Sequence, residues 1–317
     1  RGMDRPELVV SAIPHVHSGN TLQKRMLKII IALIPAVLMG IYFFGLVTIK
    51  VILLAILFTL IWEALCKKIV GRPLETINLS AVVWGLLLAL ALPPSAPWWL
   101  IAVGTLVMVI LGKELYGGYG NNPFSGVLVA WVVLQMSFPA LMNNWTPPPG
   151  DLMTMSSPLE VFKNEGPMFV FTYHGWGDLL WGSTAGYIGE VSYLMLLLGG
   201  VYLIWQKVIS WRIPISFLAG ILFFSAIFWL IDPQTHASPL FHLFAGGTFF
   251  VAFFLATDFP SSPTTPKGML LYGFLAGVLA LIIRMWGEWT SGAYYAVFLI
   301  SLLTPFLDKI TPRVYGR

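Results

Sequence analysis

Cysteine and charge are both scarce in this chain of 317 residues. Cys66 is the only cysteine, which excludes an internal disulfide and an iron–sulfur cluster held by four thiolates. No glycine-rich loop opens a helix after a strand, so the sequence predicts neither a nucleotide-binding fold nor a nucleic-acid partner. The histidines show no spacing typical of metal ligands, and they are His15, His17, His174, His236 and His242.

Hydrophobic residues make up 57% of the chain, whereas charged residues make up only 10%. A bilayer core requires about 20 apolar residues per helix, and the chain has room for about ten such runs. The sequence therefore predicts an all-α integral membrane protein with about ten transmembrane helices. The expected spans are residues 26–44, 47–65, 79–92, 98–115, 125–141, 192–209, 213–230, 240–256, 269–285 and 293–307.

Basic residues divide unevenly between the two sides of this predicted topology. If both termini are cytoplasmic, only Lys50, Lys163 and Arg284 of the 18 lysines and arginines fall on the outer side. Positive charge in short loops favours the cytoplasmic side of a membrane. The pattern predicts a multi-pass membrane protein, with cytoplasmic termini and with residues 142–190 in an extracytoplasmic loop.

The two halves of the sequence share a proline pattern. Pro94-Ser95-Ala96-Pro97 aligns with Pro260-Ser261-Ser262-Pro263, and Ser125-Gly126 aligns with Ser291-Gly292 at the same offset. Five spans per half would invert the second copy, which predicts two inverted five-helix repeats. The expected regions are an N-terminal cytoplasmic segment (1–25), a first repeat (26–141), the outer loop (142–190) and a second repeat (191–317).

The third span of each repeat, residues 79–92 and 240–256, is short and ends in the proline-rich turn. Irregular backbone at membrane depth is tolerated where it lines a cavity or packs against protein, so these spans indicate a binding site at the repeat interface. The alternative is that the prolines only mark entries into loops.

A few polar residues stand in or beside the apolar runs, where charge is costly. Glu63 has Lys67 one helical turn later, which predicts an i,i+4 ion pair. Asp258, after Thr257 in the second proline-rich turn, is a candidate for an ion path or a cofactor contact, or is an ordinary acid at a helix end. His242 is expected to be packed in the interior rather than to bind a ligand.

A glycine-rich run, residues 112–124, separates the fourth and fifth expected spans. It is either a flexible turn or a ligand site. Its glycines permit close approach of a ligand to the backbone. Amides and aromatic faces suited to a ring-shaped ligand are supplied by Asn121, Asn122, Tyr116, Tyr119 and Phe124.

Five runs together carry a family resemblance. They are Ala12-Ile13-Pro14-His15, Gly112-Lys113-Glu114-Leu115-Tyr116-Gly117-Gly118 with Asn122-Pro123-Phe124, Gly186-Tyr187-Ile188-Gly189-Glu190-Val191-Ser192, His242-Leu243-Phe244-Ala245-Gly246-Gly247-Thr248 with Ala256-Thr257-Asp258, and Pro312-Arg313-Val314-Tyr315-Gly316. The sequence resembles the RnfD subunit of Rnf-type ion-translocating ferredoxin:NAD oxidoreductases. The NqrB subunit of the sodium-pumping NADH:quinone reductase is similar, but more weakly.

The resemblance implies a subunit that carries electrons through two flavins. One is an FMN esterified through its phosphate to the outer loop, and the other is a non-covalent riboflavin. The family's attachment pattern falls on Asp151, Thr154, Ser156, Ser157, Pro158 and Leu159, with Ser157 as the acceptor. Ser156 replaces the usual alanine and Ser157 the usual threonine, so attachment requires a flavin transferase that accepts serine.

The resemblance also implies contacts for the second flavin. These are Lys113, Gly117, Gly118, Asn121 and Asn122, with Thr257 and Asp258 as weaker candidates for that site or for an ion path. No catalytic residue and no metal ligand is expected, because the subunit would carry electrons rather than convert a substrate. Its implied partners are the lipid bilayer, a flavin transferase, a G-type flavoprotein, an A/E-type membrane pair, a C-type NAD-binding subunit and a B-type iron–sulfur subunit.

The predicted function is electron relay between ferredoxin and NAD, coupled by the complex to movement of Na⁺ or H⁺. An alternative of another class is a channel for a small polar solute, because inverted five-helix repeats with interrupted third spans also resemble the urea-transporter architecture. A second alternative is an NqrB-like subunit of a quinone-reducing sodium pump.

Overall fold

The computed structural model describes residues 21–71, 79–146, 156–166, 175–182 and 184–310, and the regular structure in these ranges is helical. The helices, in chain order, are α1 Leu22–Phe44, α2 Leu46–Val70, α3 Leu79–Leu90, α4 Trp98–Gly112, η1 Glu114–Tyr116, α5 Gly126–Ser137, α6 Pro139–Met142, α7 Pro158–Glu165, α9 Trp176–Trp181, η2 Ile188–Glu190, α10 Tyr193–Trp205, α11 Arg212–Ile231, α12 Pro239–Leu243, α13 Thr248–Phe250, η3 Val251–Leu255, α14 Pro266–Trp286, α15 Gly292–Ser301 and α16 Thr304–Leu307.

Five helical segments are long and apolar enough to cross a membrane. They are α1, α2, Trp98–Tyr116, α11 and α14, and the shorter apolar helices α3, α5, α10 and α15 lie between or after them in the chain. The predicted all-helical class with several apolar helices is therefore confirmed. The number of ten spans, the inverted repeat and the four predicted regions stay predictions.

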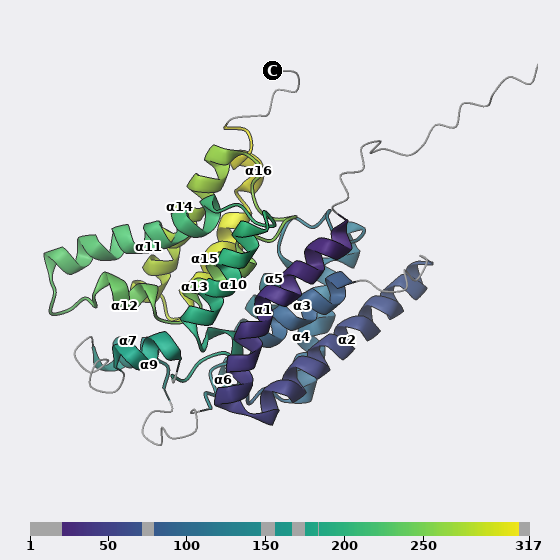
Figure 1. Ribbon diagram of the computed structural model, residues 1–317, viewed down its shortest axis with the longest axis horizontal. Coiled ribbons are helices and arrows are strands. Elements are labelled where there is room, and N and C mark those ends of the chain that lie inside the picture. Colours follow the sequence, from purple (N-terminus) through teal and green to yellow (C-terminus); the bar gives the residue numbers. More distant parts are fainter. Residues whose placement is uncertain (1–20, 72–78, 147–155, 167–174, 183, 311–317) are drawn as a thin grey trace, which may run out of the picture.

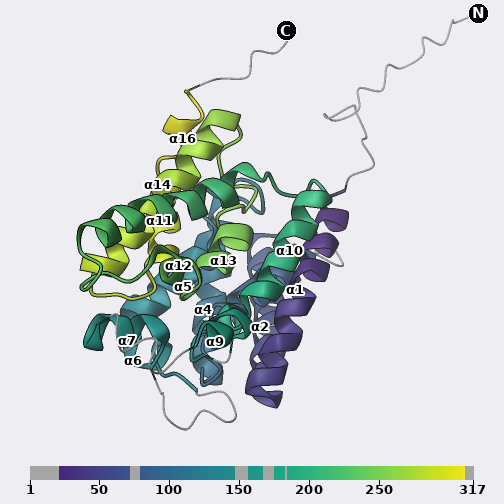
Figure 2. The same ribbon diagram turned by 60° about the vertical axis from the view of Figure 1, so that its left-hand side comes forward.

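The two ends of the helical bundle differ. Figures 1 and 2 both show α16 at one end of the molecule and α7 with α9 at the other. We call these the α16 end and the α7 end. The chain enters α1 near the α16 end, turns back at Gly45 and runs along α2, so the last turn of α2 returns towards the α16 end.

Local sequence explains where the first two helices begin and end. The Thr21 side chain accepts a hydrogen bond from the Lys24 backbone N–H at 3.3 Å and so caps the start of α1. Gly45 and Gly71, at the ends of α1 and α2, have φ of 68° and 72°. This left-handed region favours glycine, which therefore lets each helix stop abruptly.

The second half is assembled around a close pair of long helices, α11 and α14. A Cβ atom on Gly220 of α11 would lie 2.5 Å from the carbonyl oxygen of Phe274 on α14. Such a distance is shorter than any van der Waals contact, so only glycine lets the backbones approach in this way. Close packing through small residues is typical of helix pairs in membranes.

The segment expected as a single span over residues 240–256 is broken. It forms α12, a turn at Gly246 with φ of 63°, the short α13 and then a π-helical segment, η3. The break frees the carbonyl group of His242, which accepts a hydrogen bond from Arg284 Nη1 at 2.7 Å. A buried side chain therefore replaces a helical hydrogen bond, which is how broken helices persist in apolar surroundings.

An aromatic cluster joins the two halves. Trp131 of α5 stacks on Tyr294 of α15, with ring centroids 4.3 Å apart and an angle of 14° between the planes. Tyr187 contacts both rings edge-on, and its hydroxyl donates to Gln135 Oε1 at 3.2 Å. These rings are fully buried, so they fix how α5 and α15 meet beside η2.

Candidate functional site

A cavity of about 310 Å³ lies at the α16 end. Four aromatic side chains of its wall come from α3, the glycine-rich turn and η3, and they are Trp84, Tyr119, Phe253 and Phe254. The rings of Trp84 and Tyr119 meet edge-on at 5.7 Å. Ligand sites in proteins commonly combine about this volume with a mostly apolar and aromatic lining.

Polar groups stand on two sides of this cavity. Arg25 comes from the first turns of α1, and Thr257 and Asp258 come from the turn after η3. Asp258 is hydrogen-bonded to the Ser125 side chain, but its Oδ2 atom has no partner among the described residues. A buried carboxylate oxygen without a donor is costly unless a ligand or water supplies one.

The glycine-rich turn contributes one side chain, the ring of Tyr119, to the cavity wall. Gly117, Gly118 and Gly120 have φ of 95°, 119° and 110°, so glycine is required at each place. The amide of Asn122 closes the turn, because its Oδ1 accepts from Gly120 N–H at 3.3 Å and its Nδ2 donates to Phe124 O at 2.6 Å. The turn thereby holds Tyr119 in the cavity wall.

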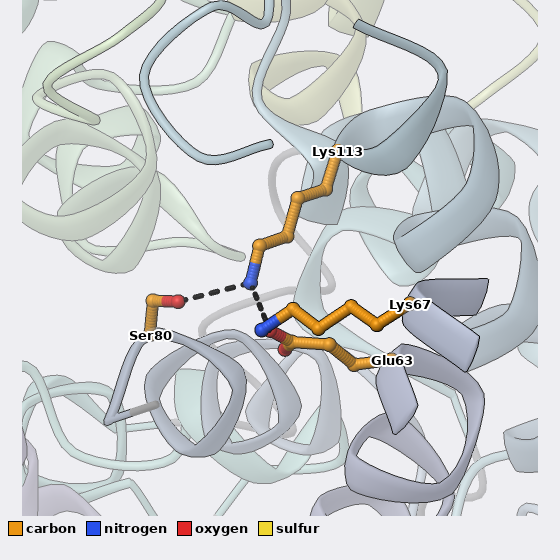
Figure 3. A network of polar contacts seen from close by, with 4 residues as sticks. All are labelled: Glu63, Lys67, Ser80 and Lys113. Carbon is orange, nitrogen blue, oxygen red and sulfur yellow. Dashed lines mark hydrogen bonds and ion pairs between the residues drawn. The ribbon is translucent and has the colours of Figure 1, made fainter. Parts of the chain in front are cut away.

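Lys113 begins this turn but does not line the cavity. Its ammonium group donates to Glu63 Oε1 at 2.9 Å and to Ser80 Oγ at 3.1 Å (Figure 3). Lys67 donates to the same Glu63 oxygen at 2.7 Å, which confirms the expected i,i+4 pair. Lys113 is only 2% exposed, so this ion pair ties the ends of α2, α3 and α4 together in the interior.

The predicted contacts of the second flavin thus fall into two groups. Thr257 and Asp258, the weaker candidates, line the cavity directly. Lys113 is directed to Glu63, and Gly117, Gly118, Asn121 and Asn122 belong to the turn behind Tyr119 rather than to the lining. Sequence reasoning missed Trp84, Phe253 and Phe254, because an aromatic residue inside an apolar run reads as lipid-facing or core.

Ser157, the predicted acceptor, is the N-cap of α7. Its Oγ accepts from Glu160 N–H at 3.3 Å, while Glu160 Oε2 accepts from Ser157 N–H at 3.1 Å and from Trp145 Nε1 at 2.7 Å. These hydrogen bonds form a reciprocal capping box, and Ser157 is only 8% exposed. Ser156 precedes it, Pro158 is the first residue of α7, and Asp151 and Thr154 lie outside the described residues.

A second, much smaller cavity adjoins Ser157. It measures about 10 Å³, which is about the volume that one water molecule needs. Its lining includes Trp145, Thr184, Glu190 and Gly246. Glu190 Oε1 accepts a hydrogen bond from Tyr294 Oη at 3.0 Å, and burial raises the pKa of Glu190 to about 7, against the opposing effects of Tyr294 and Arg284.

Arg284 is a buried cation at the α7 end. It is 3% exposed, and its two Nη atoms donate to His242 O at 2.7 Å and to Thr248 Oγ1 at 2.8 Å. Within the described ranges, no carboxylate forms an ion pair with it and its Nε has no acceptor. His242 is packed in the interior as expected, 1% exposed and edge-on to Phe162.

No group of three or more histidine, cysteine or acidic side chains in the described part of the chain is arranged to hold a metal ion.

The cavity lined by Trp84 and the cavity beside Ser157 differ in the ligands that they can accept. The cavity at the α16 end has room and aromatic walls for a ring-shaped ligand. The cavity at the α7 end holds hydroxyl and carboxyl groups in the space of about one water molecule.

Comparison with known proteins gives matches over nearly the whole chain. The sequence profile of the NQR2, RnfD, RnfE family matches residues 9–316. The D subunits of ion-translocating oxidoreductase complexes are similar to this chain in Alcanivorax borkumensis (39% identical, covering 98% of this chain and 97% of the relative) and in Aeromonas hydrophila (36%, covering 97% and 98%).

The corresponding protein of Aliivibrio salmonicida is 37% identical over 97% of this chain and 98% of its own length. The resemblance seen in the five sequence runs is therefore confirmed by similarity along the full length. The chain belongs to the NQR2, RnfD, RnfE family.

Proposed function

We propose that this chain is a membrane subunit of an ion-translocating electron-transport complex, and that it relays electrons between ferredoxin and NAD through two flavins. Its relatives are named as D subunits of an ion-translocating oxidoreductase complex, which supports the assignment to such a complex. The complex would couple this relay to movement of Na⁺ or H⁺. Ferredoxin and NAD would react on other subunits of that complex.

The cavity at the α16 end is the observation that carries this proposal. Its aromatic walls suit a planar ring, and the unpartnered Oδ2 of Asp258 suits a donor on the polar edge or sugar-like chain of a riboflavin. A bound flavin would supply one- and two-electron transfer, which the side chains of this chain do not offer. Trp84 and Tyr119 would orient the ring, while Phe253 and Phe254 would exclude water.

Covalent FMN at Ser157 is the second part of the proposal. The hydroxyl at a helix N-terminus has the right chemistry for a phosphoester. Space is the difficulty, because the adjacent cavity measures about 10 Å³ and the Glu160 carboxylate occupies the cap. In the packed state of α7 an attached flavin therefore does not fit.

The distribution of charge supports a sidedness for the proposed subunit. Lys67, Lys68 and Lys113 lie in or near the ends of α2 and α4 at the α16 end, and Arg25 and Lys28 lie near the start of α1. Positive charge favours the cytoplasm. We therefore place the α16 end on the cytoplasmic face of a bacterial inner membrane and α7 on the opposite face.

Flavin content tests the proposal directly. The full chain, purified with its complex, is expected to release a non-covalent flavin on acid treatment and to keep a fluorescent band in denaturing electrophoresis. Replacing Trp84 or Asp258 (Trp84→Ala, Asp258→Asn) should remove most of the released flavin. The control Trp98→Ala changes a tryptophan that is 62% exposed and remote from the cavity lining, and it should leave the flavin content unchanged.

Two results would contradict this assignment. A wild-type complex without releasable flavin would remove the role of the cavity. Equal loss of flavin in Trp98→Ala and Trp84→Ala would show that general destabilisation, rather than the cavity wall, governs binding.

A further inference from the structure

Helix α7 packs on the protein through a hydrophobic cluster of its own. The cluster is separate from the main core and consists of Leu159, Val161, Leu179, Ala237, Phe241 and Ala245, with Phe162 packed against it. In Figures 1 and 2, α7 lies with α9 at one end of the bundle. A small satellite cluster can open without disturbing the main core, so α7 is suited to local undocking.

Two side chains, Phe162 and Lys163, hold α7 on the second half of the chain. The Phe162 ring meets the rings of Phe241 at 5.6 Å and His242 at 5.3 Å. Lys163 Nζ donates to the carbonyl oxygen of Gly287 at 2.6 Å and also to that of Glu288. These partners follow α7 by many residues in the sequence, so docking brings distant segments together.

Docking of α7 also closes the hydroxyl of Ser157. The residue is 8% exposed, its Oγ is engaged by the Glu160 N–H, and the space beside it measures about 10 Å³. Glu190 lines this space, and the Glu160 carboxylate accepts from the Ser157 N–H beside it. A phosphoester at Oγ would therefore lack room and would meet the Glu160 carboxylate that closes the cap.

We propose that α7 is a latch over the acceptor, so that docking of α7 and modification of Ser157 exclude each other. The inference rests on the proposed covalent flavin. In the attachment step, the pyrophosphate bond of a flavin dinucleotide breaks and Ser157 Oγ bonds to the phosphorus on the flavin side. The nucleoside monophosphate leaves, the hydroxyl proton passes to a base of the transferase, and nothing is oxidised or reduced.

The exclusion is reciprocal because it is an equilibrium. Whatever weakens docking of α7 raises the reactivity of Ser157, and an attached flavin phosphate keeps α7 away from its docked position. The acceptor is thus open before α7 packs onto the second half of the chain, and it closes if packing precedes attachment.

A thiol at position 157 tests the latch without any flavin. The full chain carries Ser157→Cys in a Cys66→Ser background, and the rate of maleimide labelling is measured in lipid nanodiscs. Labelling should be slow, and adding Phe162→Ala should speed it about tenfold, the effect of weakening docking by about 1.4 kcal/mol. The matched control Phe306→Ala removes a 65% exposed ring on α16 and should change nothing.

Lys163→Met provides a second, milder variant, which should change the labelling rate in the same direction as Phe162→Ala. Labelling of the docked chain as fast as that of a cysteine on an exposed loop would overturn the latch. The latch is equally contradicted if neither Phe162→Ala nor Lys163→Met accelerates the reaction.

Flavin transfer to the native serine separates the latch from the proposed cofactor. The full chain, made without transferase, is incubated with a flavin transferase and FAD, and covalent fluorescence is followed. Phe162→Ala should be modified faster than wild type, and Ser157→Ala should stay dark. If every chain stays dark, the covalent flavin is wrong even when the thiol assay shows an opening α7. Equal rates in wild type and Phe162→Ala overturn the latch alone.

Discussion

Among the described residues, each end of the molecule contains one deeply buried cation, and the two are held in different ways. Lys113 lies just beyond the end of α4 and pairs with the Glu63 carboxylate and the Ser80 hydroxyl (Figure 3). Arg284, in the last turn of α14, donates to the His242 carbonyl and the Thr248 hydroxyl. The Lys113 charge is neutralised by a carboxylate in direct contact. Arg284 instead donates hydrogen bonds to uncharged oxygen atoms at the break between α12 and α13.

The difference follows from the chemistry of the two cations. An ammonium is a compact charge that needs a counter-ion when it leaves water, and Glu63 supplies it. A guanidinium is a planar fork whose several donors can hold separate acceptors in fixed positions. The lysine thus anchors the glycine-rich turn by charge, while the arginine replaces hydrogen bonds that α12 and α13 lost.

Removing the carboxylate should have the largest effect. Glu63→Gln leaves Lys113 buried without a counter-ion, and we expect a loss of about 3–5 kcal/mol of stability. Denaturant unfolding of the purified chain in detergent measures it. Lys67→Gln, which removes the more exposed of the two lysines, should cost far less. Equal losses in the two variants would contradict an interior counter-ion role for Glu63.

A pH series tests the α7 end, through the effect of Glu190 on stability. Burial raises the pKa of Glu190 from 4.5 to about 7, so its uncharged form is favoured in the folded chain. Stability from this group is complete below about pH 4.5, and about 3 kcal/mol is lost as pH rises through about 7. Melting temperatures of wild type and Glu190→Gln should therefore diverge with rising pH. Parallel pH profiles would show that Glu190 does not titrate in this range.

Replacing the Arg284 guanidinium by an ammonium group tests whether charge alone accounts for the stability of this site. Arg284→Lys keeps the charge, but a single ammonium reaches His242 O or Thr248 Oγ1 rather than both, with an expected cost of about 2 kcal/mol. Thermal unfolding in detergent measures this cost. The hydroxyl deletion Thr248→Val removes one acceptor and serves as the smaller companion. If Arg284→Lys unfolds no earlier than wild type, charge alone would explain this site.

The smallest expected effect concerns the cap of α7. Ser157→Ala removes the acceptor for the Glu160 N–H and should cost about 1 kcal/mol. Ser157→Asp keeps a capping oxygen and should retain most of that stability, although it adds a charge near Glu190. Hydrogen exchange of residues 158–165 reports the local opening. No difference between the alanine and aspartate variants would show that the capping box does not stabilise α7.

Much of the helical layout was predictable because apolar runs and helix ends are local properties. Helices cover the expected runs, the Glu63–Lys67 pair forms at i,i+4 spacing, and His242 is buried as expected. The break inside residues 240–256 was not predictable in detail. It depends on Arg284, which lies on a different helix and supplies the missing donor.

The candidate sites divide in the same way. Thr257 and Asp258 were found from sequence because a polar pair beside an apolar run is conspicuous. The aromatic wall built by Trp84, Phe253 and Phe254 was not, since these rings converge only when α3 and η3 pack. Ser157 was predicted as the acceptor from its motif, but the packing of α7 that buries it depends on contacts with α12 and the end of α14.

By itself, the sequence determined the all-helical class with its apolar helices, the family and the Glu63–Lys67 pair. These depend on composition and on residues a few positions apart, where spacing fixes geometry. Tertiary structure alone decided which cation meets which acceptor, where a cavity opens and whether the Ser157 hydroxyl is accessible. Each of these requires side chains from distant segments to lie in one small volume. Burial then determines how strongly their charges affect the stability of the fold.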